Sequence, residues 1–182
     1  MTYFLSPIMP TLNPTTSSLD RTPYSKACPN AVSHPAQTVG TLVFIEEFKH
    51  IKSLHDAADN HSPKFSCTDL ISACISLTFA LQRPEVMIFT YLHTELLLRN
   101  PKTQRRPEEI WKPQYDLLLT LQRSRMNSHP NPHFTLDHFT TACIAIVIRQ
   151  KLPSADIYSQ ARRNTAARVA TGEACGFDNR WR

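Results

Sequence analysis

Hydrophobic side chains in the first half of the chain recur at the spacing of a helix. Phe44, Phe48 and Ile51 lie four and three residues apart, which places them on one helical face. The pattern predicts a helix over residues 41–60. Its first residues, Thr-Leu-Val-Phe-Ile, are also typical of a short strand, and we keep this alternative open.

Two consecutive segments are apolar nearly all round, which is the pattern of helices buried at the centre of a fold. The first covers residues 68–82, and Ser66 or Thr68 can cap its start. The second covers residues 85–99, and Pro84 suits its first helical position. Because the connection between them is very short, we expect an antiparallel helical hairpin in the core.

The next part of the chain predicts a loop followed by two helices. We expect residues 102–106 to form a basic loop, and residues 107–126 to form a helix that Pro113 kinks or delays. Thr135 can cap the following helix, which ends before the next proline. The β-branched stretch 143–148 within this helix makes a strand the second choice there.

The last predicted helix runs from Ala155 to about Thr171, with Ser154 as its N-cap and Gly172 at the position of a C-terminal cap. Glycine, which supplies positive φ in tight hairpin turns, occurs only three times in the chain. This scarcity disfavours a β-sandwich or barrel. The sequence therefore predicts an all-α fold, a compact bundle of roughly five or six helices.

The ends of the chain differ in composition from its middle. Residues 1–39 contain six of the fourteen prolines, many serines and threonines, and almost no charge. This composition predicts a disordered N-terminal arm. We therefore divide the chain into this arm, a helical domain over residues 40–172, and a short irregular tail, basic and aromatic, over residues 173–182.

The chain is basic, with a net charge of +5 and a pI near 9.1, which favours acidic partners such as nucleic acid. Its five cysteines are odd in number and form no Cys-x-x-Cys pair, which indicates reduced thiols. No secretory signal is recognisable, and the longest apolar stretch, 70–81, is too short to cross a bilayer. We expect an intracellular protein, cytoplasmic or nuclear, without a membrane partner.

Motifs of catalysis and cofactor binding are absent from the sequence, including the phosphate-binding glycine loop and the nucleophile elbow. His129, His133 and His138 carry zinc-binding side chains, but the first two lie in a proline-broken loop. A solvated loop is the preferred interpretation. Cys74 and Cys143 lie on apolar faces, unlike reactive thiols. The sequence thus predicts no catalytic residue, no metal ion and no cofactor.

Two groups of basic and aromatic residues are candidates for a binding surface, because cations neutralise phosphates and aromatic rings stack on unpaired bases. The first group comprises Arg105, Arg106, Trp111 and Lys112, and the second comprises Arg162, Arg163 and Arg168 with Phe177, Arg180, Trp181 and Arg182. For the first group, the alternative is a core Trp111 beneath solubilising arginines. In the second group, the arginines of the predicted helix lie on different sides of it, whereas the large apolar rings of the tail are expected to pack against another surface, of this chain or of a partner.

The leading hypothesis is a non-enzymatic protein that binds single-stranded nucleic acid through its phosphates, without sequence preference, and that self-associates as a structural subunit. A proline-rich arm, a helical core and a basic end form a layout similar to that of helical nucleocapsid and coat subunits, without a shared motif. The alternative is a helical protein–protein interaction module that docks through Phe177 and Trp181.

Overall fold

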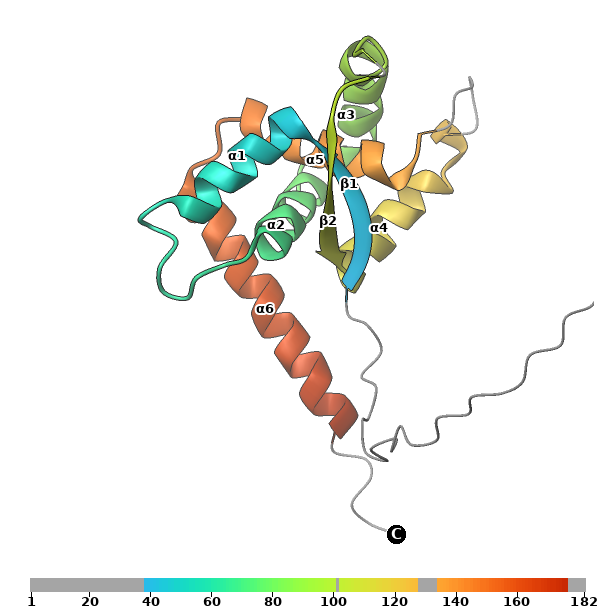
Figure 1. Ribbon diagram of the computed structural model, residues 1–182. Helices are drawn as coiled ribbons and strands as arrows, with labels where there is room; N and C mark the ends of the chain where they lie inside the picture. The colour runs from blue at the N-terminus through green and yellow to red at the C-terminus, as the bar shows by residue number, and fades with distance from the viewer. Residues whose placement is uncertain (1–37, 101, 128–133, 177–182) are drawn as a thin grey trace, which may run out of the picture. The chain divides into compact units, whose positions relative to one another are not determined.

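The structure is a computed structural model that describes residues 38–100, 102–127 and 134–176, with side chains as far as residue 170. In chain order, the elements are β1 (Thr38–Phe44), α1 (Ile45–Asp56), α2 (Cys67–Phe79), α3 (Pro84–Tyr91), the π-helical turn η1 (Leu92–Leu96), β2 (Arg105–Trp111), α4 (Lys112–Gln122), the 3₁₀ turn η2 (Arg125–Asn127), α5 (Leu136–Arg149) and α6 (Ser154–Gly176) (Figure 1). The described chain is mostly helical, as predicted, with an additional two-stranded sheet. Residues 1–37 of the predicted arm lie outside the described residues.

The sheet is an antiparallel pair in which Val39 faces Ile110 and Phe44 faces Arg105. The strand alternative for the start of the first segment is therefore confirmed. The predicted loop is confirmed only for residues 102–104, and the predicted helix start at 107 is wrong, because β2 occupies Arg105–Trp111. A proline within a strand cannot donate a ladder hydrogen bond, so a sheet of only two strands, both of them edges, can hold Pro107.

Helix α2 lies at the centre of the fold, between α6 and the two strands, and also packs on α1 and α5 (Figure 1). Most of its residues are buried, namely Leu70, Ile71, Ser72, Ala73, Cys74, Ile75 and Thr78. Its start carries a capping box in which Ser66 and Asp69 exchange hydrogen bonds. The prediction of a central, capped helix in this segment is confirmed.

The helix boundaries differ from the predicted ones at two places. Helix α3 starts at Pro84, as predicted, but the α-helical geometry ends at Tyr91 and continues as the π turn η1. Helix α6 passes through Gly172 to Gly176, so the predicted cap at Gly172 is wrong. A glycine inside a helix costs only about 1 kcal/mol relative to alanine, and the alanine-rich sequence around it outweighs that cost.

The expected delay at Pro113 and the predicted helix start at Thr135 are confirmed. Pro113 lies in the first turn of α4 and delays its start to Lys112. Thr135 caps α5 through a capping box in which His138 takes the place of the usual glutamate. Residues 143–148 are helical and buried as far as Val147, so the strand alternative for them is wrong.

Candidate nucleic-acid interface

The basic residues of the first group lie on β2 or just after it, and each neutralises a carboxylate. Arg105 pairs with Asp137 at 3.8 Å, Arg106 with Glu108 at 2.8 Å, and Lys112 with Asp116. Their cationic groups also lie over the rings of Phe44, Phe48 and Tyr115, respectively. A cation that already has a carboxylate partner and an aromatic contact adds little positive potential for a phosphate. This group covers the core and forms no open basic patch.

Arg168, from the second group, is also held inside the fold. Its guanidinium lies 3.8 Å from the centre of the Trp111 ring, and its Nη2 donates to Asp69 Oδ1 at 3.0 Å. Trp111 Nε1 donates to the same oxygen at 2.8 Å. The side chains of Arg168 and Asp69 are 14% and 16% exposed. Arg168 therefore joins α6 to α2 and β2, and Trp111 takes the structural role that the sequence left open.

The charge state of Asp69 follows from these contacts. Burial alone would raise the pKa of its carboxyl group. Hydrogen bonds from Ser66 and Trp111, together with the charge of Arg168, outweigh burial and hold that pKa below its ordinary value. Asp69 is thus an ionised acceptor at neutral pH, and it serves the helix cap, the indole and the guanidinium at once.

A polar seam continues from this cluster along the contact of α6 with α2, and Gln114 of α4 joins it through Ser76. Its hydrogen bonds run from Gln114 Nε2 to Ser76 Oγ at 3.1 Å, from Ser76 Oγ to Asn164 Oδ1 at 3.3 Å, and from Gln160 Nε2 to Asn164 Oδ1 at 2.8 Å. Three buried atoms of this region have no hydrogen-bond partner within the described residues, namely Gln114 Oε1, Asn164 Nδ2 and Arg168 Nη1. Beyond its buried first turns, the inner face of α6 is therefore polar, and its hydrogen bonds are incomplete.

Arg162 and Arg163 differ from the other candidates because both are exposed and neither is paired with a carboxylate among the described residues. Arg162 Nη2 donates to the backbone oxygen of Ser62 at 3.4 Å, a long and weak contact. Arg163 Nη2 donates to Gln160 Oε1 at 2.6 Å. Their positive charge is not neutralised by a neighbour, so it is open to an anion from solution.

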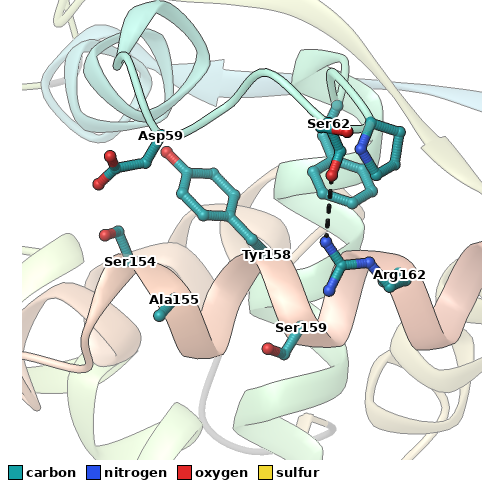
Figure 2. A pocket seen from close by; sticks show the side chains of 9 residues that line it. Asp59, Ser62, Ser154, Ala155, Tyr158, Ser159 and Arg162 are labelled. Atoms are coloured by element: carbon teal, nitrogen blue, oxygen red, sulfur yellow. Dashed lines mark hydrogen bonds between the residues drawn. The ribbon is translucent and has the colours of Figure 1, made fainter.

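A pocket of about 280 Å³ lies beside Arg162, between the first turns of α6 and the segment that connects α1 to α2 (Figure 2). It is lined by Asp59, Ser62, Pro63, Phe65, Ser154, Ala155, Tyr158, Ser159 and Arg162. The Tyr158 ring stacks on Phe65, with centroids 6.2 Å apart, and its hydroxyl donates to Leu54 O at 2.9 Å. Burial raises the pKa of Tyr158, so this hydroxyl stays protonated at neutral pH.

The side chains that line this pocket can form hydrogen bonds with both anionic and amino groups. Serine hydroxyls and a guanidinium donate hydrogen bonds to phosphate oxygens, and Asp59 at the opposite end accepts them from amino groups. A second pocket, of about 390 Å³, lies between α3 and α5, and its lining mixes the apolar Val86, Met87 and Ile146 with polar side chains. Sequence reasoning missed Asp59, Ser154 and Ser159, because short polar residues far apart in the chain carry no motif.

Two of the described cysteines are buried, and one described histidine has a shifted pKa. Cys74 and Cys143 are buried, and burial raises the pKa of Cys74 to about 12 and shifts the pKa of Cys143 upward as well. Burial, followed by the nearby charge of Arg105, lowers the pKa of His138. Within the described ranges, no three His, Cys, Asp or Glu side chains could together hold a metal ion.

Several predictions fall on positions that the structure does not describe. His129 and His133 lie outside the described residues, as do the tail positions Arg180, Trp181 and Arg182. In the part of the chain that is described, no helix is long and apolar enough to span a bilayer. No model of a known protein family matches the sequence, and neither curated proteins nor solved structures gave a match.

Proposed function

We propose that the chain is a non-enzymatic intracellular protein that binds single-stranded nucleic acid through its phosphates, without sequence preference. The observation that carries the proposal is the pair Arg162 and Arg163, which is exposed on α6 and has no carboxylate partner among the described residues. The end of the chain, which follows α6 in the sequence, would add two positive charges and a stacking ring through Arg180, Trp181 and Arg182.

The proposed interface includes only some of the basic residues that the sequence singled out. Arg105, Arg106 and Lys112 already face carboxylates, and Arg168 is enclosed between Trp111 and Asp69. These cations therefore contribute to stability more than to binding. The proposal also includes self-association as a structural subunit, comparable in layout to nucleocapsid and coat proteins, because repeated weak phosphate contacts gain strength when subunits are linked.

The test compares two charge-matched double variants of the full chain. Arg162→Ala/Arg163→Ala and Arg106→Ala/Lys112→Ala each remove two positive charges, and the side chains of Arg106 and Lys112 are 53% and 51% exposed. The measurement is the affinity for a fluorescently labelled single strand at fixed low salt. We expect the α6 variant to bind at least about tenfold more weakly, and the β2 variant to stay within about twofold of wild type. Equal losses in the two variants would reject the assigned surface.

A second candidate function is the protein–protein interaction module. Helix α6 exposes small apolar side chains beyond the polar seam, with Ala166 and Ala170 exposed and Val169 54% exposed. Such a face, on a helix that Phe177 and Trp181 follow in the sequence, suits an apolar partner. On this reading, deletion of residues 173–182 abolishes partner capture, whereas the wild-type chain binds no nucleic acid at any salt concentration.

A further inference from the structure

We propose that the protein forms dimers by exchanging α6, so that the α6 of each chain packs on the α2 of a second copy. The inference does not depend on nucleic-acid binding. It rests on the connection that leads into α6, on the elements that α6 contacts, and on the hydrogen bonding of the seam that holds it. An exchange of this kind reproduces every contact of α6 except those of the connection itself.

The connection between α5 and α6 is short and contains an unfavourable backbone conformation. Helix α5 ends at Arg149 and α6 begins at Ser154. Between them, Lys151 has a φ of 51°, in the left-handed region where the Cβ of a non-glycine residue is crowded. In an opened chain, in which α6 points away from its own core, Lys151 no longer needs this conformation. Opening therefore relieves a cost, and short strained connections favour exchange.

Helix α6 packs chiefly against one element of the core, helix α2, which lies beside it in Figure 1. Its first turns contribute the buried side chains Ile157, Tyr158 and Ala161. These apolar contacts make a free α6 unfavourable, so a released helix is driven to dock again. Because α6 depends mainly on one surface of the core, the same surface of a second copy can receive it without rearrangement elsewhere.

The second half of the contact is the polar seam, which is easier to open than an apolar one. Water can hydrogen-bond to the buried atoms that have no partner within the described residues, Gln114 Oε1, Asn164 Nδ2 and Arg168 Nη1, once α6 moves away. Part of the cost of release is thus offset. In the exchanged dimer, the same pocket beside Arg162 is formed by residues of two chains.

The first experiment changes the hinge of the full-length protein and measures the dimer fraction by size-exclusion chromatography with light scattering, over a range of protein concentrations. Lys151→Gly removes the left-handed cost of the closed monomer and should weaken dimerisation by about tenfold or more, since each dimer opens two hinges. Lys151→Pro cannot adopt a positive φ and should strengthen it. Arg83→Gly is the matched control, because Arg83 has a φ of 57° in a different connection.

The outcomes separate exchange from other kinds of association. A dimer fraction that falls with Lys151→Gly and does not change with Arg83→Gly supports the proposal. A wild-type protein that stays monomeric after refolding at high concentration overturns it, as does a dimer fraction that Lys151→Gly leaves unchanged. If Lys151→Pro does not fold, the comparison of the two glycine variants decides alone.

The second experiment tests the topology through the ion pair between Asp69 and Arg168. Asp69→Arg and Arg168→Asp each place like charges in the seam of their own chain. In an exchanged heterodimer of the two variants, both seams contain opposite charges, and one of them is the native pair. Mixing and refolding the differently tagged variants should yield heterodimers more stable than either variant alone. Refolding that returns only the separate variants would contradict exchange.

Discussion

Arg168→Ala is the substitution that best separates a structural arginine from a nucleic-acid contact. In a fully buried ion pair, loss of one partner costs about 3–5 kcal/mol. Here the partners are 14% and 16% exposed, and Asp69 keeps its bonds from Ser66 and from Trp111 Nε1. The stacking of the guanidinium on the Trp111 ring adds about 1 kcal/mol to the loss. We therefore expect the free energy of unfolding to fall by about 2–3 kcal/mol.

The assay for this prediction is urea unfolding followed by tryptophan fluorescence, since Trp111 is in direct contact with the changed residue. A double-mutant cycle with Asp69→Asn isolates the pair, and we expect a coupling free energy of about 1 kcal/mol or more. Below the unfolding transition, Arg168→Ala should bind single-stranded nucleic acid within about twofold of wild type. A loss of stability under about 0.5 kcal/mol, combined with a large loss of affinity, would refute the structural role.

The remaining predictions concern stability. Because the pKa of His138 is lowered in the folded protein, the unfolded chain binds a proton at this residue at a higher pH than the folded chain does. The contribution of neutral His138 to the free energy of unfolding is therefore full above about pH 6.5 and is lost as the pH falls through the folded pKa. In His138→Gln, the urea midpoints at pH 7.5 and 5.5 should differ less than in wild type. Arg99→Ala should cost about 3 kcal/mol in urea unfolding, because the Glu47 side chain is 6% exposed and loses two hydrogen bonds of 2.6 and 2.9 Å; the double variant with Glu47→Gln should recover part of it. Lys151→Gly should raise the stability of the dilute monomer by about 0.5–1 kcal/mol in thermal unfolding, and a decrease would show that the hinge is not strained.

Helix positions could be predicted where the apolar pattern is dense and a cap marks the start. Residues 70–75 of α2 are buried around the helix, and the sequence offers Ser66 or Thr68 as a cap, of which the structure uses Ser66 with Asp69. The strand β2 could not be predicted, because Ile110 is its one buried residue and no alternation of apolar and polar side chains is visible. Its strand conformation comes from pairing with β1, a contact distant in sequence.

For the candidate interface too, the sequence identified the charged residues but not the contacts that the fold gives them. The sequence singled out Arg162, Arg163 and Arg168 together, since all are arginines on one helix. Only the packing of α6 on α2 shows that Arg168 meets an aspartate and a tryptophan while the other two remain exposed. A positive charge is visible in a sequence, but the carboxylate that neutralises it is often brought near by the fold alone.

The most direct test of the proposed function is the salt dependence of binding to a single-stranded oligonucleotide, measured by fluorescence anisotropy between about 50 and 200 mM salt. We predict that the logarithm of the affinity falls steeply and linearly with the logarithm of the salt concentration. In Arg162→Ala/Arg163→Ala, this slope should become shallower by the amount expected for the loss of about one to two phosphate contacts. Absence of binding at low salt, or an affinity that does not change with salt, would contradict phosphate recognition.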